Sequence, residues 1–417
     1  MPLPKTLGTA VMLAAGLAPL TAQSVKLGGD VQLWYTQMLD SNLRLDGKGG
    51  RGYYNLRGEF TENTFAIRRV EVKASGTLTE DVDYEVMLDP SISTSATNPA
   101  ILQDAFISWR LGSGVNLKMG QFKNLQTYEG LTSSTEILFA ERSQLGRIFG
   151  DKRDRGAALS FAFGDPRVFG GRLTVAAFNG MGDAASGKAS DSNAQKDAVA
   201  RLEFNIDSRH KFGIYTLQGV TDVTDKGSLG IAPAAPGSAW PAQQDIYANK
   251  DATSNLGAFY AYQDSTWTFT TEVMTGLLGR RNPTLAASAP AVKREHLDQK
   301  FLGYYLTGGY TTGHHSFLLR YDFLNHNAGD RWYTAYNPYK ESAPGVPLTA
   351  QGAPVDYTPR FTETTLGYTY AFLPEKVKAA NLKVNYILRS KNFLAPRPGQ
   401  TGEQGGDTLV LAFLVAF

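Results

Sequence analysis

The chain has 417 residues, of which 19% are charged, and its formal net charge is +2 at pH 7. So small an excess of positive charge gives no basis for nucleic-acid binding, and the sequence has no basic cluster interleaved with aromatic residues. It contains no cysteine, which excludes disulfides, c-type haem attachment and cysteine-bound zinc or iron.

The first 22 residues have the pattern of a secretory signal peptide. Lys5 lies in a short amino-terminal region, an apolar stretch covers residues 7–17, and small residues end at Ala22. We expect cleavage after Ala22, which leaves residues 23–417 as the mature protein exported through the inner membrane. The apolar stretch is too short to cross a membrane, and no later run of about 18 apolar residues follows.

Sixteen segments of the mature chain alternate apolar and polar residues with the period of two that half-buried strands show. The first eight expected strands are residues 25–37, 64–74, 82–88, 101–110, 115–122, 157–163, 172–179 and 197–206. The other eight are residues 212–220, 254–263, 266–276, 300–311, 315–325, 361–372, 381–391 and 406–417. No linker or block of charge divides them, so one large sheet accounts for the whole length.

The connections between these segments alternate long and short from the first to the last. Bacterial membrane barrels have an even number of strands, with long outer loops at one end and short periplasmic turns at the other. A soluble two-sheet or propeller protein has no reason to follow that rule. We therefore predict an all-β protein, a 16-stranded antiparallel transmembrane β-barrel in the lipid of the bacterial outer membrane.

The two faces of the expected strands differ in polarity. Phe413 and Phe417 share an apolar face in the last strand, and Arg320 and Asp322 lie opposite the apolar set in residues 315–325. A charge on the lipid side costs about 2 to 4 kcal/mol at mid-depth, so the charged face must line the lumen. A polar lumen indicates a water-filled pore. We expect the barrel-assembly machinery to recognise the terminal Phe417.

Residues 64–74 contain two adjacent arginines, Arg68 and Arg69. Neighbouring side chains of a regular strand point to opposite faces. We expect Arg69 and Lys73 in the lumen and Arg68 near a membrane interface, where its long side chain reaches the headgroups.

The segment 123–156 is too long for a turn and too irregular for a strand. A loop of this length in a compact fold is functional or disordered, and interleaved residues such as Ile137, Phe139 and Leu145 argue against disorder. We predict that this third long loop folds into the lumen, narrows the bore and turns its charges toward passing solutes.

The sequence resembles the phosphate-selective porins of the O and P type. The resemblance rests on FAIRRVEVKASGTLTEDVDYEVMLD, on DAFISWR followed by LKMGQFK, and most specifically on GQFKNLQTYEGLTSSTEILFAERSQ. It covers the first half of the chain well and the second half as a strand pattern. The resemblance implies a sixteen-stranded passive channel that favours anions, with small anions as permeating solutes and a homotrimer as the usual assembly.

One difference from that family bears on the solute. The phosphate-specialised members carry inward arginines leading to a ring of loop lysines, whereas here Lys123 is followed by Asn124 and Leu125. The acidic and basic residues that follow nearly cancel. Such a constriction orients a field across the bore without making a phosphate site. We therefore expect a preference for anions, with phosphate as one example.

Selectivity in a channel depends on the charges at its narrowest point. The expected cations of the constriction are Lys118, Lys123, Arg142, Arg147, Arg153 and Arg155. The expected cations of the pore wall are Arg69, Lys73, Arg201, Arg320, Lys383 and Arg389. The alternative for both sets is that ion pairs with nearby carboxylates pin the loop or balance a wet wall, so that single removals change conductance little.

Neither catalytic nor metal chemistry is indicated by the sequence. The five histidines lie in or beside expected turns and loops, without a Ser/His/Asp or His/Glu cluster at ligand-like spacing. The glycine-rich stretch 47–52 lacks the strand–loop–helix setting of a phosphate cradle. We expect no enzyme activity, no cofactor and no metal.

Two functions fit these patterns. The first is an outer-membrane porin for passive diffusion of small hydrophilic solutes. The second is a structural or receptor barrel with a plugged lumen, whose binding surface is formed by the long loops at residues 221–253 and 326–360. Deleting residues 125–145 separates them, because a plugged receptor begins to conduct whereas a porin conducts more and selects less.

Overall fold

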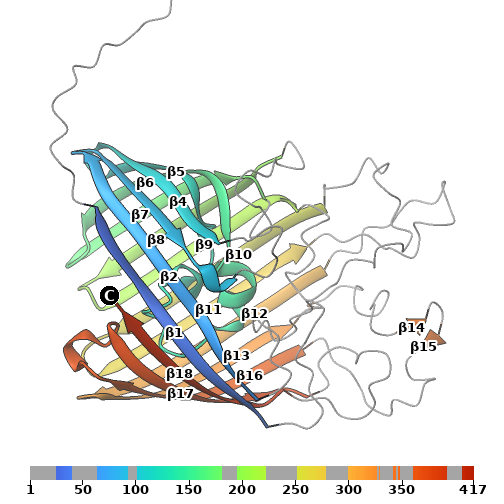
Figure 1. Cartoon of the computed structure of the whole chain (residues 1–417). Helices are drawn as coiled ribbons and strands as arrows, with labels where there is room; N and C mark the ends of the chain where they lie inside the picture. Colours follow the sequence, from blue (N-terminus) through green and yellow to red (C-terminus); the bar gives the residue numbers. More distant parts are fainter. Residues whose placement is uncertain are drawn as a thin grey trace, which may run out of the picture.

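Sixteen antiparallel strands form one closed barrel in the computed structural model of the chain (Figure 1). The structure describes residues 25–39, 63–92, 101–180, 195–221, 251–278, 299–325, 328, 341–343, 346–347, 360–391 and 406–417. The expected signal peptide, and most of the two long loops considered as a binding surface, lie outside the described residues.

The strands follow one another around the ring in chain order. The first eight are β1 (Lys26–Met38), β2 (Thr64–Thr79), β3 (Val82–Leu88), β4 (Leu102–Gly112), β5 (Val115–Lys123), β6 (Arg153–Asp165), β7 (Phe169–Phe178) and β8 (Asp197–Ile206). The others are β9 (His210–Thr221), β10 (Asp251–Gln263), β11 (Trp267–Leu278), β12 (Gln299–Thr312), β13 (His315–Asn325), β16 (Arg360–Ala371), β17 (Ala380–Arg389) and β18 (Thr408–Ala416). Outside the ring, β14 (Glu341–Ala343) pairs with β15 (Val346–Pro347).

The ring closes between the first and last strands. β1 and β18 pair from Asp30 opposite Ala416 to Met38 opposite Thr408. Beyond that ladder, Gly29 and Phe417 each donate a backbone N–H to the other's carbonyl oxygen at 3.0 Å. Each described strand of the ring therefore has a paired neighbour on both sides, which is the condition for crossing lipid with strands.

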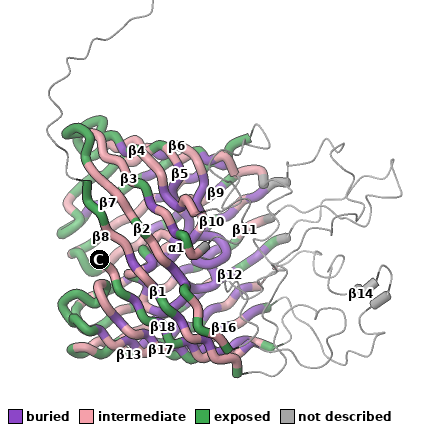
Figure 2. Tube along the Cα trace, in the orientation of Figure 1, coloured by how far each residue is buried: buried purple, intermediate pink, exposed green. Residues whose placement is uncertain are grey.

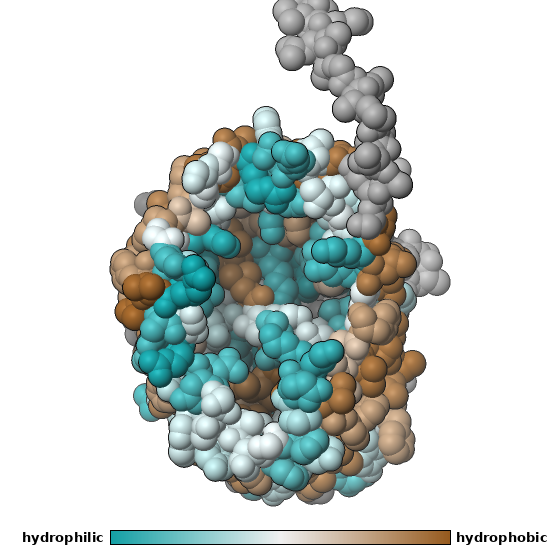
Figure 3. All heavy atoms as spheres, turned by 90° about the vertical axis from the view of Figure 1, so that its left-hand side faces the viewer, coloured by the Kyte–Doolittle hydropathy of each residue, from teal (hydrophilic) through white to brown (hydrophobic). Residues whose placement is uncertain are grey.

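The two faces of the wall differ as their alternation predicts. On β13, Phe317 and Leu319 are exposed on the outside, whereas Arg320 and Asp322 are buried. Buried positions gather in the middle of the wall and around the loop between β5 and β6, while the short-turn end is exposed (Figure 2). Seen from the short-turn end, the barrel is hollowed, hydrophilic atoms surround the opening and hydrophobic atoms cover much of the outer right-hand side (Figure 3).

The adjacent arginines of β2 lie on one side of the wall, and the expectation that Arg68 lies near a membrane interface is wrong. Gln32 pairs with Arg69 and the next residue, Leu33, pairs with Ile67, so the register shifts between them and Arg68 is the extra residue. A β-bulge of this kind places two consecutive side chains where a regular strand would place one. Both arginines are consequently buried.

The ends of the strands around the third long loop also differ from the expected ones. β6 begins at Arg153 rather than at residue 157, and β5 ends at Lys123. Lys123 pairs with Arg153, and Gln121 pairs with Arg155, so these three cations belong to the wall. Charged side chains extend the two strands here because they have buried partners, which strand propensity does not reveal.

No helix among the described residues is long and apolar enough to span a membrane.

Candidate pore site

The connection between β5 and β6, residues 124–152, is called here the β5–β6 segment; it folds on itself through two short helical turns, α1 (Tyr128–Leu131) and η2 (Gly146–Gly150). Thr127 caps α1, because its hydroxyl accepts the N–H of Gly130 at 3.0 Å. A Cβ at position 150 would lie 1.7 Å from the Thr127 hydroxyl oxygen, so the close approach of the two turns requires glycine there.

Asp151 is the centre of a buried cluster of cations. Its carboxylate lies 2.8 Å from Arg142, 3.3 Å from Lys123, 3.4 Å from Arg153 and 3.6 Å from Arg69. Arg142 also donates to the carbonyl oxygens of residues 129 and 132, at 2.8 Å each. One carboxylate thus holds together the two ends of the segment and the strands β2, β5 and β6.

The β5–β6 segment is bonded to strands on distant parts of the ring. The Arg147 guanidinium lies 2.7 Å from the Glu363 carboxylate of β16. Backbone N–H groups of the segment donate to wall side chains: Tyr128 to Glu272 on β11 at 2.7 Å, Ala140 to Asn385 on β17 at 2.7 Å and Gln144 to Asp322 on β13 at 2.9 Å. Further contacts reach Asp30 on β1, Arg68 on β2, Arg201 on β8 and Asn255 on β10.

Glu141 joins the segment to the bulge of β2. Its carboxylate accepts a hydrogen bond from Arg68, whose guanidinium lies 4.9 Å from the centre of the Trp34 ring. Burial would raise the pKa of Glu141, but the charges of Arg68, Arg69 and Arg147 outweigh burial and hold its pKa well below the ordinary value. Glu141 is therefore a carboxylate over the whole neutral and mildly acidic range.

Apolar side chains of the β5–β6 segment pack against the strands β9 to β13. Leu145, Ile148 and Phe149 of the segment form one buried cluster with wall side chains that include Met274 and Phe301. The rings of Phe149 and Phe301 stack with their centres 4.5 Å apart. Burying such side chains contributes roughly 1.5 to 3 kcal/mol each, so the segment is held by packing as well as by charge.

Five of the six expected wall cations are buried and bonded to protein groups. Lys73 is the exception, since its side chain is 43% exposed while its amine lies 2.6 Å from Glu85. Arg69 contacts Asp151, Arg201 contacts Glu203 at 3.0 Å, Arg320 contacts Asp322 at 2.7 Å, Arg389 contacts Glu363 at 2.8 Å, and Lys383 donates to the carbonyl oxygens of Ile137 and Phe139.

The expected constriction cations separate into two groups. Lys123, Arg142, Arg147 and Arg153 take part in the ion pairs just described, and Arg155 is half-buried on β6. Lys118 lies apart from them. Its amine is 4.0 Å from the centre of the Phe106 ring and 5.5 Å from that of Phe122.

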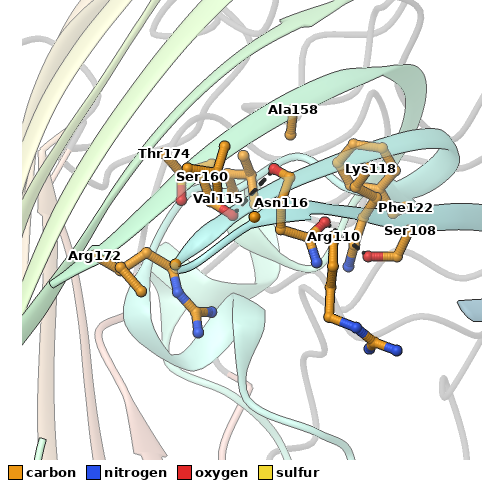
Figure 4. A pocket seen from close by; sticks show the side chains of 14 residues that line it. Ser108, Arg110, Val115, Asn116, Lys118, Phe122, Ala158, Ser160, Arg172 and Thr174 are labelled. Carbon is orange, nitrogen blue, oxygen red and sulfur yellow. Dashed lines mark hydrogen bonds between the residues drawn. The ribbon is translucent and has the colours of Figure 1, made fainter. Parts of the chain in front are cut away.

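A cavity of about 370 Å³ lies beside Lys118, against β4 to β7 and the turn between β4 and β5 (Figure 4). Arg110 and Arg172 line it too, and in Figure 4 both guanidinium groups project to the same side. These two arginines are absent from the residues expected from the sequence. Their strand parity is the signal that could have identified them, because Trp109 and Leu173, their chain neighbours, are exposed apolar residues of the outer face.

The described histidines form hydrogen bonds with tyrosine hydroxyls or a backbone carbonyl. His210 and His315 each share a hydrogen bond with a tyrosine hydroxyl, of Tyr260 at 2.7 Å and of Tyr368 at 2.8 Å. Within the described ranges, no group of three His, Cys, Asp or Glu side chains is arranged to hold a metal.

The chain resembles solved porins in fold. It aligns with an anion-selective porin from Comamonas acidovorans (12% identity, 95% of this chain and 100% of that one, TM-score 0.51) and with the trimer form of OmpT, an outer membrane protein of Vibrio cholerae (10%, 95% and 100%, 0.52). OprB of Pseudomonas putida aligns similarly (10%, 94% and 94%, 0.53). A search of curated proteins found no match.

The family comparison is more specific than the fold. The family model of the phosphate-selective porins O and P matches residues 39–371, which include β2 to β13 and the whole β5–β6 segment. Family and fold together indicate a porin of the bacterial outer membrane. The chain belongs to the phosphate-selective porin O and P family.

Proposed function

We propose that the protein is a passive diffusion channel of the outer membrane that admits small hydrophilic solutes and prefers anions, phosphate among them. In this proposal the chain performs no chemistry on its solute. Its task is to hold a water-filled path open and to set the charge along that path.

The observation that carries the proposal is the uneven coverage of the wall. The β5–β6 segment bonds to β1, β2, β8, β10, β11, β13, β16 and β17, and through Asp151 it also contacts the adjoining ends of β5 and β6. The cavity lies against β4 to β7. We infer that the segment folds into the lumen as its constriction and that water and solutes pass on the β4 to β7 side.

The charges on that side support a preference for anions. Arg110 pairs with Asp83, and Arg153 with Asp104 at 3.5 Å. Lys118 and Arg172 form no ion pair with a carboxylate among the described residues. A cation and an oxyanion about 4 Å apart attract by roughly 1 kcal/mol in bulk water and about 4 kcal/mol at an effective dielectric constant near 20, so two unpaired cations in a confined path favour anions.

The test is a reversal potential. Purified protein is inserted into a planar bilayer under a KCl gradient, and the potential at zero current is measured in single-channel recordings. Stepwise conductance with a reversal potential of anion sign is the expected result. Absence of conductance contradicts the pore, and a reversal potential of cation sign contradicts the anion preference alone.

A plugged receptor barrel is the second candidate, and the apolar packing of Leu145, Ile148 and Phe149 against β9 to β13 favours it. Deletion of residues 125–145 distinguishes the two functions. A porin conducts before the deletion and selects less after it, whereas a plugged barrel conducts only after it.

We also propose a homotrimer. The family and the trimer form of the Vibrio cholerae relative support this assembly. An unheated sample should migrate in a detergent gel as a compact species about three times the mass of the heated one. A single monomeric band in both lanes, together with monomeric mass in detergent solution, contradicts the trimer.

A further inference from the structure

We propose that the cavity against β4 to β7 is a binding subsite for a small organic anion, one with a carboxylate head and an apolar body. This inference rests on the proposed channel function and adds a solute class to it. Three features of the cavity carry it: its cations, its apolar wall and its size.

The cations of the cavity are placed to meet a carboxylate head. Lys118 extends from β5 and Arg172 from β7, whereas Arg110 of β4 lines the cavity but is paired with Asp83. The Lys118 amine is supported by the rings of Phe106 and Phe122 rather than by a carboxylate, so its N–H groups stay available for a solute. Arg172 is exposed, and a planar guanidinium matches a carboxylate with two parallel hydrogen bonds.

Uncharged polar groups line the same cavity. Ser108 donates its hydroxyl proton to the Asn116 side-chain oxygen at 2.9 Å, and Ser160 bonds to the Asn116 carbonyl at 3.4 Å (Figure 4). The first of these bonds holds the Asn116 side-chain oxygen, which leaves the amide nitrogen to donate, and the second reaches the Asn116 backbone. A carboxylate held by Lys118 therefore has further donors within the same cavity.

The rest of the cavity lining is apolar, and an inorganic anion gains no binding energy from apolar contacts. Phe122, Leu125 and Ala158 contribute apolar side chains to the lining. A phosphate ion is hydrated on all sides and gains nothing from such contacts. An aromatic or aliphatic body that packs against these side chains is removed from water, which is favourable. The volume of about 370 Å³ falls in the range of about 300 to 1,000 Å³ that small-molecule sites occupy. The combination selects an amphiphilic solute.

The experiment measures block of the single-channel current. Sodium benzoate, as the organic probe, and inorganic phosphate are titrated separately at pH 7.5 against a constant KCl background. We expect benzoate to reach half-block at a concentration about tenfold lower than phosphate, the factor that burial of part of a phenyl ring contributes.

Two variants divide the subsite into its parts, and a third is the control. Lys118→Gln removes the cation and should weaken the block by both anions about tenfold. Ala158→Ser adds only a hydroxyl to an apolar lining position opposite Lys118, and should weaken benzoate block alone. Arg167→Gln removes a charge from the exposed turn between β6 and β7, outside the lining, and should change neither.

The outcomes separate the subsite from the channel. Equal block by benzoate and phosphate, or benzoate block that Lys118→Gln and Ala158→Ser leave unchanged, overturns the subsite while an anion-selective conductance keeps the proposed function. A wild-type protein that does not conduct overturns both proposals.

Discussion

Replacing Asp151 by asparagine tests how the β5–β6 segment is held. The substitution keeps the shape of the side chain and removes its charge. Four cations lie within 3.6 Å of that carboxylate, namely Lys123, Arg142, Arg153 and Arg69. Without the negative charge of Asp151, nothing at the centre of the cluster offsets the repulsion between these four cations.

The expected magnitude follows from the remaining partners. Removing one partner of a buried ion pair costs about 3 to 5 kcal/mol. Arg142 keeps its bonds to two carbonyl oxygens, and Arg153 keeps Asp104 at 3.5 Å, so we expect the lower end, about 3 kcal/mol. Because every 1.36 kcal/mol is about a factor of ten, the detached state of the segment should become on the order of 100-fold more populated.

The assay is single-channel recording combined with limited proteolysis in detergent. Asp151→Asn should give larger and noisier open-channel currents and faster cleavage within residues 124–152, while the barrel stays folded because opening is local. Asp165→Asn is the matched control, since it makes the same change at an exposed turn pair with Arg167. Wild-type noise and cleavage in Asp151→Asn would show that this carboxylate does not hold the segment in place.

Three further predictions concern the same segment and its wall. The pKa of Glu141 is lower in the folded protein than its ordinary 4.5, so its contribution to thermal stability should be complete above about pH 4.5 and decline as the pH falls below it. Glu141→Gln should flatten that decline, and a melting temperature that falls with pH as steeply as in the wild type would contradict this. Gly150→Ala forces a Cβ to 1.7 Å from a hydroxyl oxygen, so holding the β5–β6 segment in place should cost about 1 to 3 kcal/mol more and channel noise should increase. Gly308→Ala should behave as wild type, because no atom lies within 4 Å of the added Cβ. Lys383→Met removes a buried charge bonded to carbonyl oxygens and should leave the reversal potential unchanged, whereas Lys118→Gln should shift it. Equal shifts in the two variants would show that Lys383 faces the solute.

The strands were predictable because their alternation is local. Residues 82–88, 197–206 and 315–325 have the expected ends as β3, β8 and β13, since each face meets one environment along its whole length. The bulge at Arg68 was not predictable, because a register shift depends on how β1 and β2 pair. That shift decides which arginines are buried together.

The partners of the loop were not predictable for a similar reason. Arg147 meets Glu363, which follows it by 216 residues, and no spacing in the sequence connects them. The alternation of β13 and β17 does assign Arg320 and Lys383 to the inner face. It does not show that Arg320 and Lys383 are bonded to the β5–β6 segment, whereas Lys118 lies against aromatic rings. That distinction is visible only in the folded structure.

Cysteine accessibility can show whether water passes along the β4 to β7 side of the lumen, as we propose. The chain has no cysteine of its own, so a single introduced thiol is the only one to react. Ser160→Cys lies in the cavity lining, and Thr307→Cys replaces a side chain that is 1% exposed on β12. A charged, water-soluble thiosulfonate should reduce the current of Ser160→Cys at once and leave that of Thr307→Cys unchanged. If Thr307→Cys is modified and Ser160→Cys does not react, water passes on the β12 side and the proposed path is wrong.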